Sequence, residues 1–121
     1  MRKKVYHLAT CTTCQRILKD LEIGDDFEMQ NIKTEKMTSV QVDEMKDLSG
    51  SYESLFSRNA MKYRDWNLRE KKLQEHDYRQ YIIDEYTFLK RPVFLIGDKI
   101  FVGNSKTNVE AVAKELAKIK A

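Results

Sequence analysis

The sequence lacks any long hydrophobic run, which excludes one class of protein at the outset. No stretch of its 121 residues approaches the roughly 20 apolar residues that a membrane-spanning helix needs. The first residues, Met-Arg-Lys-Lys and a short mixed segment, also lack the apolar centre of a secretory signal peptide. We therefore expect a cytoplasmic protein that does not span a membrane. In that compartment cysteines are kept reduced, so a disulfide is more often catalytic or sensory than structural.

The chain also has little excess charge of either sign. Its 22 Lys and Arg residues oppose 19 Asp and Glu residues, which leaves a net charge of +3, and the two signs are interleaved. A protein that binds nucleic acids usually gathers basic residues on one face, and no such cluster is visible. The sequence thus predicts no direct contact with nucleic acids, while a local anion site stays open. It has no internal repeat or linker, so we expect a single domain over residues 1–121.

Metal ligands are equally scarce. A structural zinc site needs four ligands, and the only cysteines and histidines are Cys11, Cys14, His7 and His76. We therefore expect no metal site. A second alternative is that both cysteines are small buried hydrophobic residues, as free cysteines often are. Their flanking threonines and their position at the end of a predicted strand argue against it.

What the sequence does have is a Cys-x-x-Cys motif at a strand-to-helix junction. An apolar-rich segment with Val5, Tyr6 and Leu8 predicts a strand, and a helical pattern follows Cys14. The first turn of a helix offers unpaired N–H groups and the positive end of the helix dipole, which favour a thiolate at Cys11. Cys14, one turn later, is placed to attack a mixed disulfide formed at Cys11. In a cytoplasmic protein the motif predicts redox chemistry.

The rest of the first half predicts a helix, a strand and a further helix. Residues 13–23 have a helical pattern, and Gly24 is expected to end that helix. In residues 27–32, apolar and polar side chains alternate, as is typical of a half-buried strand. Thr38 or Ser39 is the expected N-cap of a helix that closes near Gly50, with Val42, Met45 and Leu48 facing inward. A short helical turn is expected at residues 51–56.

The second half predicts more helices, a pair of strands and a last helix. Residues 66–76 are rich in helix-forming residues, and Asp77 is the expected N-cap of a helix over residues 78–89. Residues 93–96 predict a strand buried on both faces, which turns at Gly97-Asp98 into an antiparallel strand at 100–102. A helix should run from Thr107 or Asn108 to Ile119. Its inward residues should be Val109, Val112, Ala113, Leu116 and Ile119.

This order of elements predicts an α/β fold. A strand, helix and strand, then helices, then two strands and a helix form a thioredoxin-like (glutaredoxin-like) mixed sheet with helices on both faces. The helical insertion covers residues 38–89, before Pro92.

Four segments together resemble a known family. These are Thr-Cys-Thr-Thr-Cys-Gln-Arg near the start, Leu-Phe-Ser-Arg-Asn in mid-chain, Lys-Arg-Pro-Val-Phe later, and Val-Gly-Asn after the last strand. In order and spacing they are similar to the ArsC/Spx/YffB group, the glutaredoxin-coupled arsenate reductases and their relatives, over essentially the whole chain. The resemblance implies that Cys11 is the nucleophile. It also implies that Arg58 and Arg91 bind an oxyanion, and that Pro92 is a cis-proline facing the cysteine loop.

The chain departs from the arsenate reductase pattern at two places. The reductases have a third arginine just after the last strand, where this chain has Val-Gly-Asn, and they carry serine at the position of Cys14. Both differences favour thiol–disulfide chemistry, and the second cysteine is the pattern of Spx-like members.

Two functions follow as expectations. The first is an oxidoreductase with no bound cofactor, recycled by glutathione, glutaredoxin or thioredoxin, whose substrate is arsenate or a disulfide. The alternative is an Spx-like regulator whose Cys11–Cys14 disulfide switches its binding to the RNA polymerase α subunit. A scaffold role is disfavoured, because a scaffold does not require Cys-x-x-Cys at a helix N-terminus.

Overall fold

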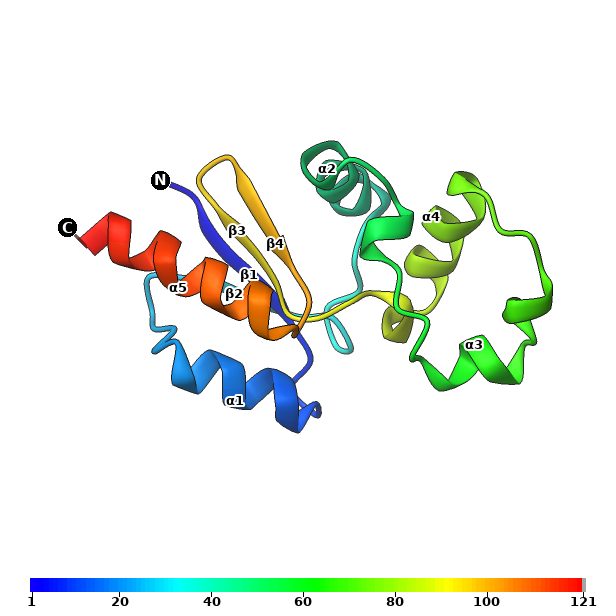
Figure 1. Cartoon of the computed structure of the whole chain (residues 1–121), viewed down its shortest axis with the longest axis horizontal. Coiled ribbons are helices and arrows are strands. Elements are labelled where there is room, and N and C mark those ends of the chain that lie inside the picture. The colour runs from blue at the N-terminus through cyan, green and yellow to red at the C-terminus, as the bar shows by residue number, and fades with distance from the viewer. Residues whose placement is uncertain (121) are drawn as a thin grey trace. The chain divides into compact units, whose positions relative to one another are not determined.

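The computed structural model describes residues 1–120, and these residues form two compact units (Figure 1). The first unit comprises residues 1–35 together with the chain from Arg91 onward, and the second comprises residues 36–90. The first contains all the strands of the sheet and the second is helical. Among the described residues, no helix combines the length and the apolar character needed to cross a membrane.

The first unit is built on a four-stranded mixed sheet. Its strand order is β2-β1-β3-β4, with β1 parallel to β2 and antiparallel to β3, and β3 antiparallel to β4. The α/β class and the thioredoxin-like element order predicted from the sequence are therefore confirmed. The elements are β1 (Lys3–His7), α1 (Thr12–Asp20), β2 (Glu28–Asn31), β3 (Val93–Ile96), β4 (Lys99–Val102) and α5 (Lys106–Lys120).

Helices α1 and α5 share one hydrophobic core with the sheet. Ile17 and Leu18 of α1 and Val112 of α5 pack with residues of β1 and β3 that project from the same face. The aromatic ring of Phe27 meets that of Phe94 edge-on, with ring centroids 6.4 Å apart. Because α1 is held by this core, its N-terminus, which carries both cysteines, has a fixed position beside the end of β1 (Figure 1).

The end of α1 differs from the prediction. The helix stops at Asp20, and the left-handed residue that follows it is Glu22 (φ 56°), although Gly24 was expected to end the helix. The backbone N–H of Ile23 donates to Leu18 O and that of Glu22 donates to Lys19 O, each at 3.0 Å. These two bonds form a Schellman motif, which ends the helix before Gly24 is reached.

The predicted alternation of buried apolar and exposed polar residues along β2 is also wrong in part. Gln30 is buried whereas Met29 is 43% exposed. The buried amide is tolerated because Gln30 Nε2 donates to the backbone oxygen of Glu35 at 3.1 Å. Phe27 and Ile32, at the two ends of the segment, are buried as apolar residues should be.

The second unit is made of short helices around an aromatic core. Phe56 is fully buried, stacks on Phe88 with ring centroids 5.0 Å apart, and meets Tyr78 at 4.9 Å. Tyr81 and Trp66 extend the cluster. The helices are α2 (Ser39–Ser49), η1 (Glu53–Leu55), α3 (Met61–Asp65), η2 (Leu68–Glu70), α4 (Glu75–Asp84) and η3 (Tyr86–Phe88).

The caps of α2 are as expected, and the helix over residues 66–76 is not present. Thr38 and Gln41 form a reciprocal capping box, and Gly50 ends the helix at φ 102°. Within residues 66–76, Asn67 instead adopts a left-handed conformation (φ 55°), only the short 3-10 helix η2 forms at Leu68–Glu70, and the chain is not helical again until Glu75.

Three smaller expectations also differ from the structure. Asp77 lies in the first turn of α4 and accepts from the backbone of Gln74, so Gln74 rather than Asp77 is the cap. Leu48 is 39% exposed and Ala113 is exposed, although both were expected to face inward. Helix α5 begins one residue before Thr107, because Ser105 accepts from the backbone N–H of Asn108 at 3.1 Å.

Candidate functional site

Cys11 is the N-cap of α1, directly before the first helical residue. It has extended backbone angles (φ −91°, ψ 108°), and its Sγ accepts a hydrogen bond from the Cys14 backbone N–H at 3.4 Å. A thiolate at this N-cap position would face N–H groups that the helix leaves unpaired. Cys11 is half-buried while Cys14 is fully buried, and both are free thiols. The pair is therefore asymmetric, with the accessible sulfur first in the chain.

The two thiols also differ in electrostatic environment. Burial raises the pKa of the Cys14 thiol, and the nearby Cys11 acts in the same direction. A hydrogen bond with the Leu8 backbone and the positive charge of Arg91 oppose this shift without cancelling it. Cys14 is consequently held as a protonated thiol at neutral pH, as suits a group that reacts second.

The loop that carries the cysteines is anchored at both ends. The Cys11 backbone N–H donates to Leu8 O, and the Gln15 backbone N–H donates to Cys11 O, each at 3.0 Å. The Asn31 side chain, at the end of β2, accepts from the Ala9 backbone N–H at 3.3 Å. Sequence reasoning named neither Asn31 nor Gln15, because their partners become neighbours only in the folded chain.

Arg91 and Pro92 lie in the same unit as the cysteines. Arg91 is close enough for its charge to act on Cys14, and the Arg91–Pro92 peptide bond is cis. The Pro92 carbonyl accepts from the Gly103 backbone N–H at 2.9 Å, which joins this segment to the end of β4. A guanidinium near a pair of thiols is suited to an anionic substrate or to developing negative charge.

Arg58 belongs to the helical unit and has partners there. Its Nη2 donates to Glu53 Oε2 at 2.7 Å and to the Tyr78 hydroxyl at 3.0 Å, and the guanidinium lies 5.7 Å from the Tyr78 ring centroid. The Glu53 hydrogen bond is the main cause of a raised Arg58 pKa. That Arg58 binds an oxyanion stays a prediction.

The two histidines have different surroundings. His7, the last residue of β1, is only 9% exposed, and burial lowers its pKa. Its Nδ1 lies 3.1 Å from Gln15 Nε2. The His76 side chain is 76% exposed and lies beside Asp77. Across residues 1–120, no three His, Cys, Asp or Glu side chains are grouped so that they could hold a metal ion.

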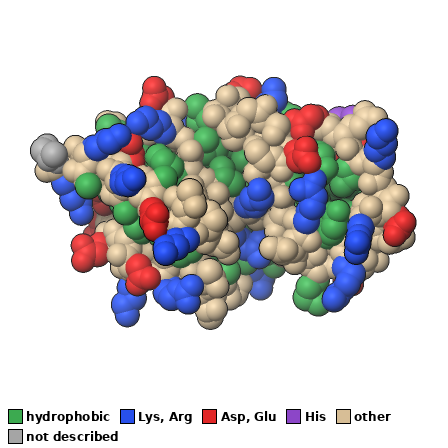
Figure 2. Space-filling model, viewed as in Figure 1, with side chains coloured by type: hydrophobic (Ala, Val, Ile, Leu, Met, Phe, Trp, Pro, Cys, Tyr) green, Lys and Arg blue, Asp and Glu red, His purple; other side chains and the backbone are tan. Residues whose placement is uncertain are grey.

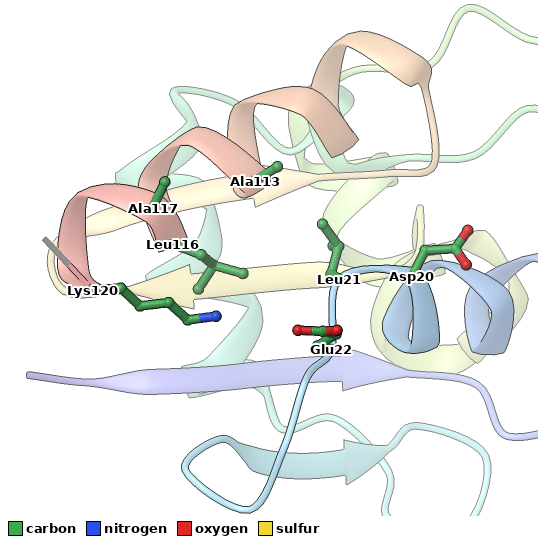
Figure 3. Close-up of a pocket in the computed structure, with 7 residues that line it drawn as sticks. All are labelled: Asp20, Leu21, Glu22, Ala113, Leu116, Ala117 and Lys120. Atoms are coloured by element: carbon green, nitrogen blue, oxygen red, sulfur yellow. The ribbon is translucent and has the colours of Figure 1, made fainter.

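A cavity of about 230 Å³ lies at the other end of α1 from the cysteines. Figure 3 shows Leu21 and Leu116 on opposite sides of it, with Lys120 extending toward Glu22. It has no thiol or arginine and therefore adds nothing to the redox chemistry. Its lining residues are Asp20, Leu21, Glu22, Ala113, Leu116, Ala117 and Lys120.

The surface shown in Figure 2 carries basic side chains interspersed with acidic ones.

Comparison with known proteins gives consistent matches over nearly the whole length. The model of the ArsC family matches residues 6–112. An uncharacterized protein, YusI of Bacillus subtilis (strain 168), is 27% identical over 109 residues, which cover 87% of this chain and 92% of YusI. The chain also resembles the solved structure of SACOL0876 from Staphylococcus aureus COL, with 26% identity and a TM-score of 0.72, covering 90% and 96% of the two chains.

A more distant structure has the same fold. The arsenate reductase from Vibrio cholerae is 14% identical to this chain and has a TM-score of 0.75, with 94% of this chain and 97% of that chain covered. At this level of identity the likeness concerns the fold alone.

Proposed function

The chain belongs to the ArsC family, whose model covers most of its length, and on that basis we propose that it is a thiol–disulfide oxidoreductase with Cys11 as nucleophile and Cys14 as resolving thiol. The observation that carries the proposal is the asymmetry of the pair. Cys11 is partly accessible at the N-cap of α1, whereas Cys14 is buried and its pKa is raised. This asymmetry supports the proposal that Cys11 attacks first and Cys14 second.

The proposed reaction has two displacement steps. The Cys11 thiolate attacks one sulfur of a substrate disulfide, which forms a mixed disulfide and releases the other substrate sulfur as a thiolate. Cys14 then gives up its proton and attacks Cys11 Sγ, which breaks the mixed disulfide and releases the second substrate thiol. The substrate has gained two electrons and the protein holds a Cys11–Cys14 disulfide. A dithiol protein such as glutaredoxin or thioredoxin, or two molecules of glutathione, returns those electrons.

The same residues could act on arsenate as substrate. Cys11 would form a covalent adduct with arsenic, with loss of a hydroxide from the oxyanion. Attack by Cys14 on Cys11 Sγ would then leave the sulfur–arsenic electron pair on arsenic, as arsenite. Arg91 and Arg58 are the residues that we propose to bind the oxyanion or the developing charge. We place this chemistry in the cytoplasm, where thiols are kept reduced.

Two substitutions test the order of the cysteines. Cys11→Ser should abolish reduction of glutathione disulfide or arsenate, because the attacking sulfur is gone. Cys14→Ser should stop at the mixed disulfide, which intact-mass spectrometry detects as a glutathione adduct on Cys11. Full activity in Cys11→Ser, or an adduct on Cys14 in the wild type, would show that the assignment is wrong.

The second candidate function is an Spx-like redox-sensitive regulator. The observation that favours it is the second cysteine, together with Val102-Gly103-Asn104 where the reductases have an arginine. A Cys11–Cys14 disulfide would then switch binding to the RNA polymerase α subunit. Co-purification with that subunit should depend on oxidation and be lost in Cys14→Ser. The absence of binding in both redox states would exclude this function.

A further inference from the structure

The side-chain amide of Gln15 bridges the end of β1 and the first turns of α1. Its Nε2 donates to the backbone oxygen of Leu8 at 3.0 Å and lies 3.1 Å from Nδ1 of His7. The Gln15 backbone N–H meanwhile donates to the carbonyl of Cys11. Gln15 thus contacts both the end of β1, which precedes the redox cysteine, and the carbonyl of that cysteine.

The Leu8 contact determines which way the amide faces. A carbonyl oxygen can only accept, so the group turned toward Leu8 O must be the NH₂ of Gln15. A flipped amide would place Oε1 against the Leu8 oxygen, and two acceptors would then face each other. The NH₂ group has two hydrogens, which allows one bond to Leu8 and a second to His7.

This orientation in turn determines the protonation of His7. Since Gln15 presents a hydrogen to Nδ1, that nitrogen must accept, and the imidazole proton must be on Nε2. The ring is then neutral. The low exposure of His7 is consistent with a neutral ring, because burial disfavours the imidazolium.

The same amide also acts on the backbone of Cys11. Leu8 O accepts from both the Cys11 N–H and Gln15 Nε2, while Cys11 O accepts from the Gln15 N–H. The side-chain amide of Gln15 thus shares Leu8 O with the Cys11 N–H, whereas the bond to Cys11 O comes from the backbone and does not depend on the side chain. Loss of the side-chain amide would remove one hydrogen bond to Leu8 O. It would also leave Nδ1 of the buried His7 ring without the Gln15 donor.

We propose that Gln15 is a positioning residue, which holds His7 as the neutral Nε2–H tautomer and fixes the Leu8–Cys11 turn. The consequence for Cys11 reactivity rests on the proposed function, whereas the consequence for His7 does not. This separation allows the two to be tested independently.

The test uses Gln15→Met, which keeps the length of the side chain without a donor, and Gln15→Glu, which replaces the donor with an acceptor. Gln80→Met is the matched control, since Gln80 is an exposed helical glutamine of the other unit. The ¹⁵N resonances of the two imidazoles report the tautomer directly, and His76 is the internal reference. The rate at which iodoacetamide alkylates Cys11 reports its reactivity.

We expect the wild-type His7 to show a proton on Nε2 alone at neutral pH. Gln15→Met should give a mixture of tautomers, and Gln15→Glu should move the proton to Nδ1 or charge the ring, with His76 unchanged in every variant. Alkylation of Cys11 should slow by about tenfold in Gln15→Met, because a loosened Leu8–Cys11 turn moves Cys11 Sγ away from the Cys14 backbone N–H that donates to it. Gln80→Met should change neither measurement.

Two results would overturn the proposal. A wild-type His7 that is protonated on Nδ1 would contradict the amide orientation, and an unchanged tautomer in both Gln15 variants would contradict the role of Gln15. If the tautomer shifts as expected while Cys11→Ser retains full turnover, the proposed function fails and the effect of Gln15 on His7 stands.

Discussion

Cys11 and Cys14 show how two identical side chains, one helical turn apart, acquire different properties. The N-cap position leaves Cys11 partly accessible and gives it a backbone donor, whereas Cys14 points into the interior. Because burial penalises the charged form, the Cys14 pKa is raised. The order of reaction proposed above follows from this difference and requires no further residue.

We predict that alkylation will discriminate between the two thiols in the native protein. Iodoacetamide at neutral pH should modify Cys11 first and spare Cys14, because only a thiolate that the reagent can reach reacts. Peptide mass spectrometry after short exposure gives the two rates. In denaturant the rates should become similar, which serves as the control. Equal native rates would contradict the assignment of Cys14 as the protected thiol.

At the scale of single elements, the end of α1 gives a sharp stability test. Glu22 has the left-handed conformation of the Schellman motif, whereas the backbone of Gly24 is not left-handed and a Cβ there would meet Asp26 at an ordinary 3.6 Å. A left-handed residue other than glycine costs about 1–2 kcal/mol. Glu22→Gly should therefore raise the free energy of unfolding by up to about 1 kcal/mol, after the greater chain entropy of glycine is subtracted.

Gly24→Ala is the matched control in the same chemical denaturation experiment. It should leave stability unchanged or slightly raised, because alanine fits the Gly24 backbone. If Gly24→Ala instead destabilised the protein and Glu22→Gly had no benefit, the helix would end at Gly24 as its sequence pattern first indicated.

The contact between α2 and α4 predicts a dependence on acid. Asp43 accepts from Arg79 Nε at 2.7 Å and from the Tyr52 hydroxyl at 2.6 Å, and these bonds, with Arg79 the larger cause, lower the Asp43 pKa to about 2. An unfolded aspartate has a pKa near 3.8. The unfolded state thus takes up the proton first, and the stabilisation by Asp43 is complete above pH 4 and lost as the pH falls toward 2.

Asp43→Asn removes the titrating group and should flatten this part of the stability profile. Urea midpoints measured between about pH 5 and pH 2 compare the variant with the wild type. Asp47→Asn on the same helix is the control, and its profile should follow the wild type. A wild-type and an Asp43→Asn profile that run parallel would contradict a contribution from the Arg79 pair.

At the scale of the whole molecule, the sequence predicted those features that depend on local pattern. The apolar run of β3, the turn at Gly97 and the Thr38 cap of α2 are each encoded within a few residues, and all are present. The continuous helix predicted over residues 66–76 is absent, because Asn67 is left-handed and Lys71 is extended (φ −99°, ψ 143°) in a segment whose composition favours helix. Composition carries no information on a single left-handed residue.

Only part of the candidate redox site could be predicted from the sequence. The Cys-x-x-Cys motif at a strand-to-helix junction located the two thiols, and the structure gives each its environment. The bridging amide of Gln15 and the anchoring side chain of Asn31 were not predicted, since each bonds to residues brought near by the fold of β1 against α1 or β2. Polar side chains that act over such distances have no signature in one sequence.

The most direct test of the central claim is a redox titration of the cysteine pair. The protein is equilibrated in glutathione buffers of graded redox potential, and its free thiols are then alkylated. Intact-mass spectrometry gives the number of alkylated thiols at each potential. We predict one two-electron transition in which Cys11 and Cys14 lose their free thiols together, with a potential within the range of about −120 to −270 mV of thiol oxidoreductases. Cys11→Ser should show no such transition. Two cysteines that titrate independently, or that stay reduced in the most oxidising buffer, would contradict the account.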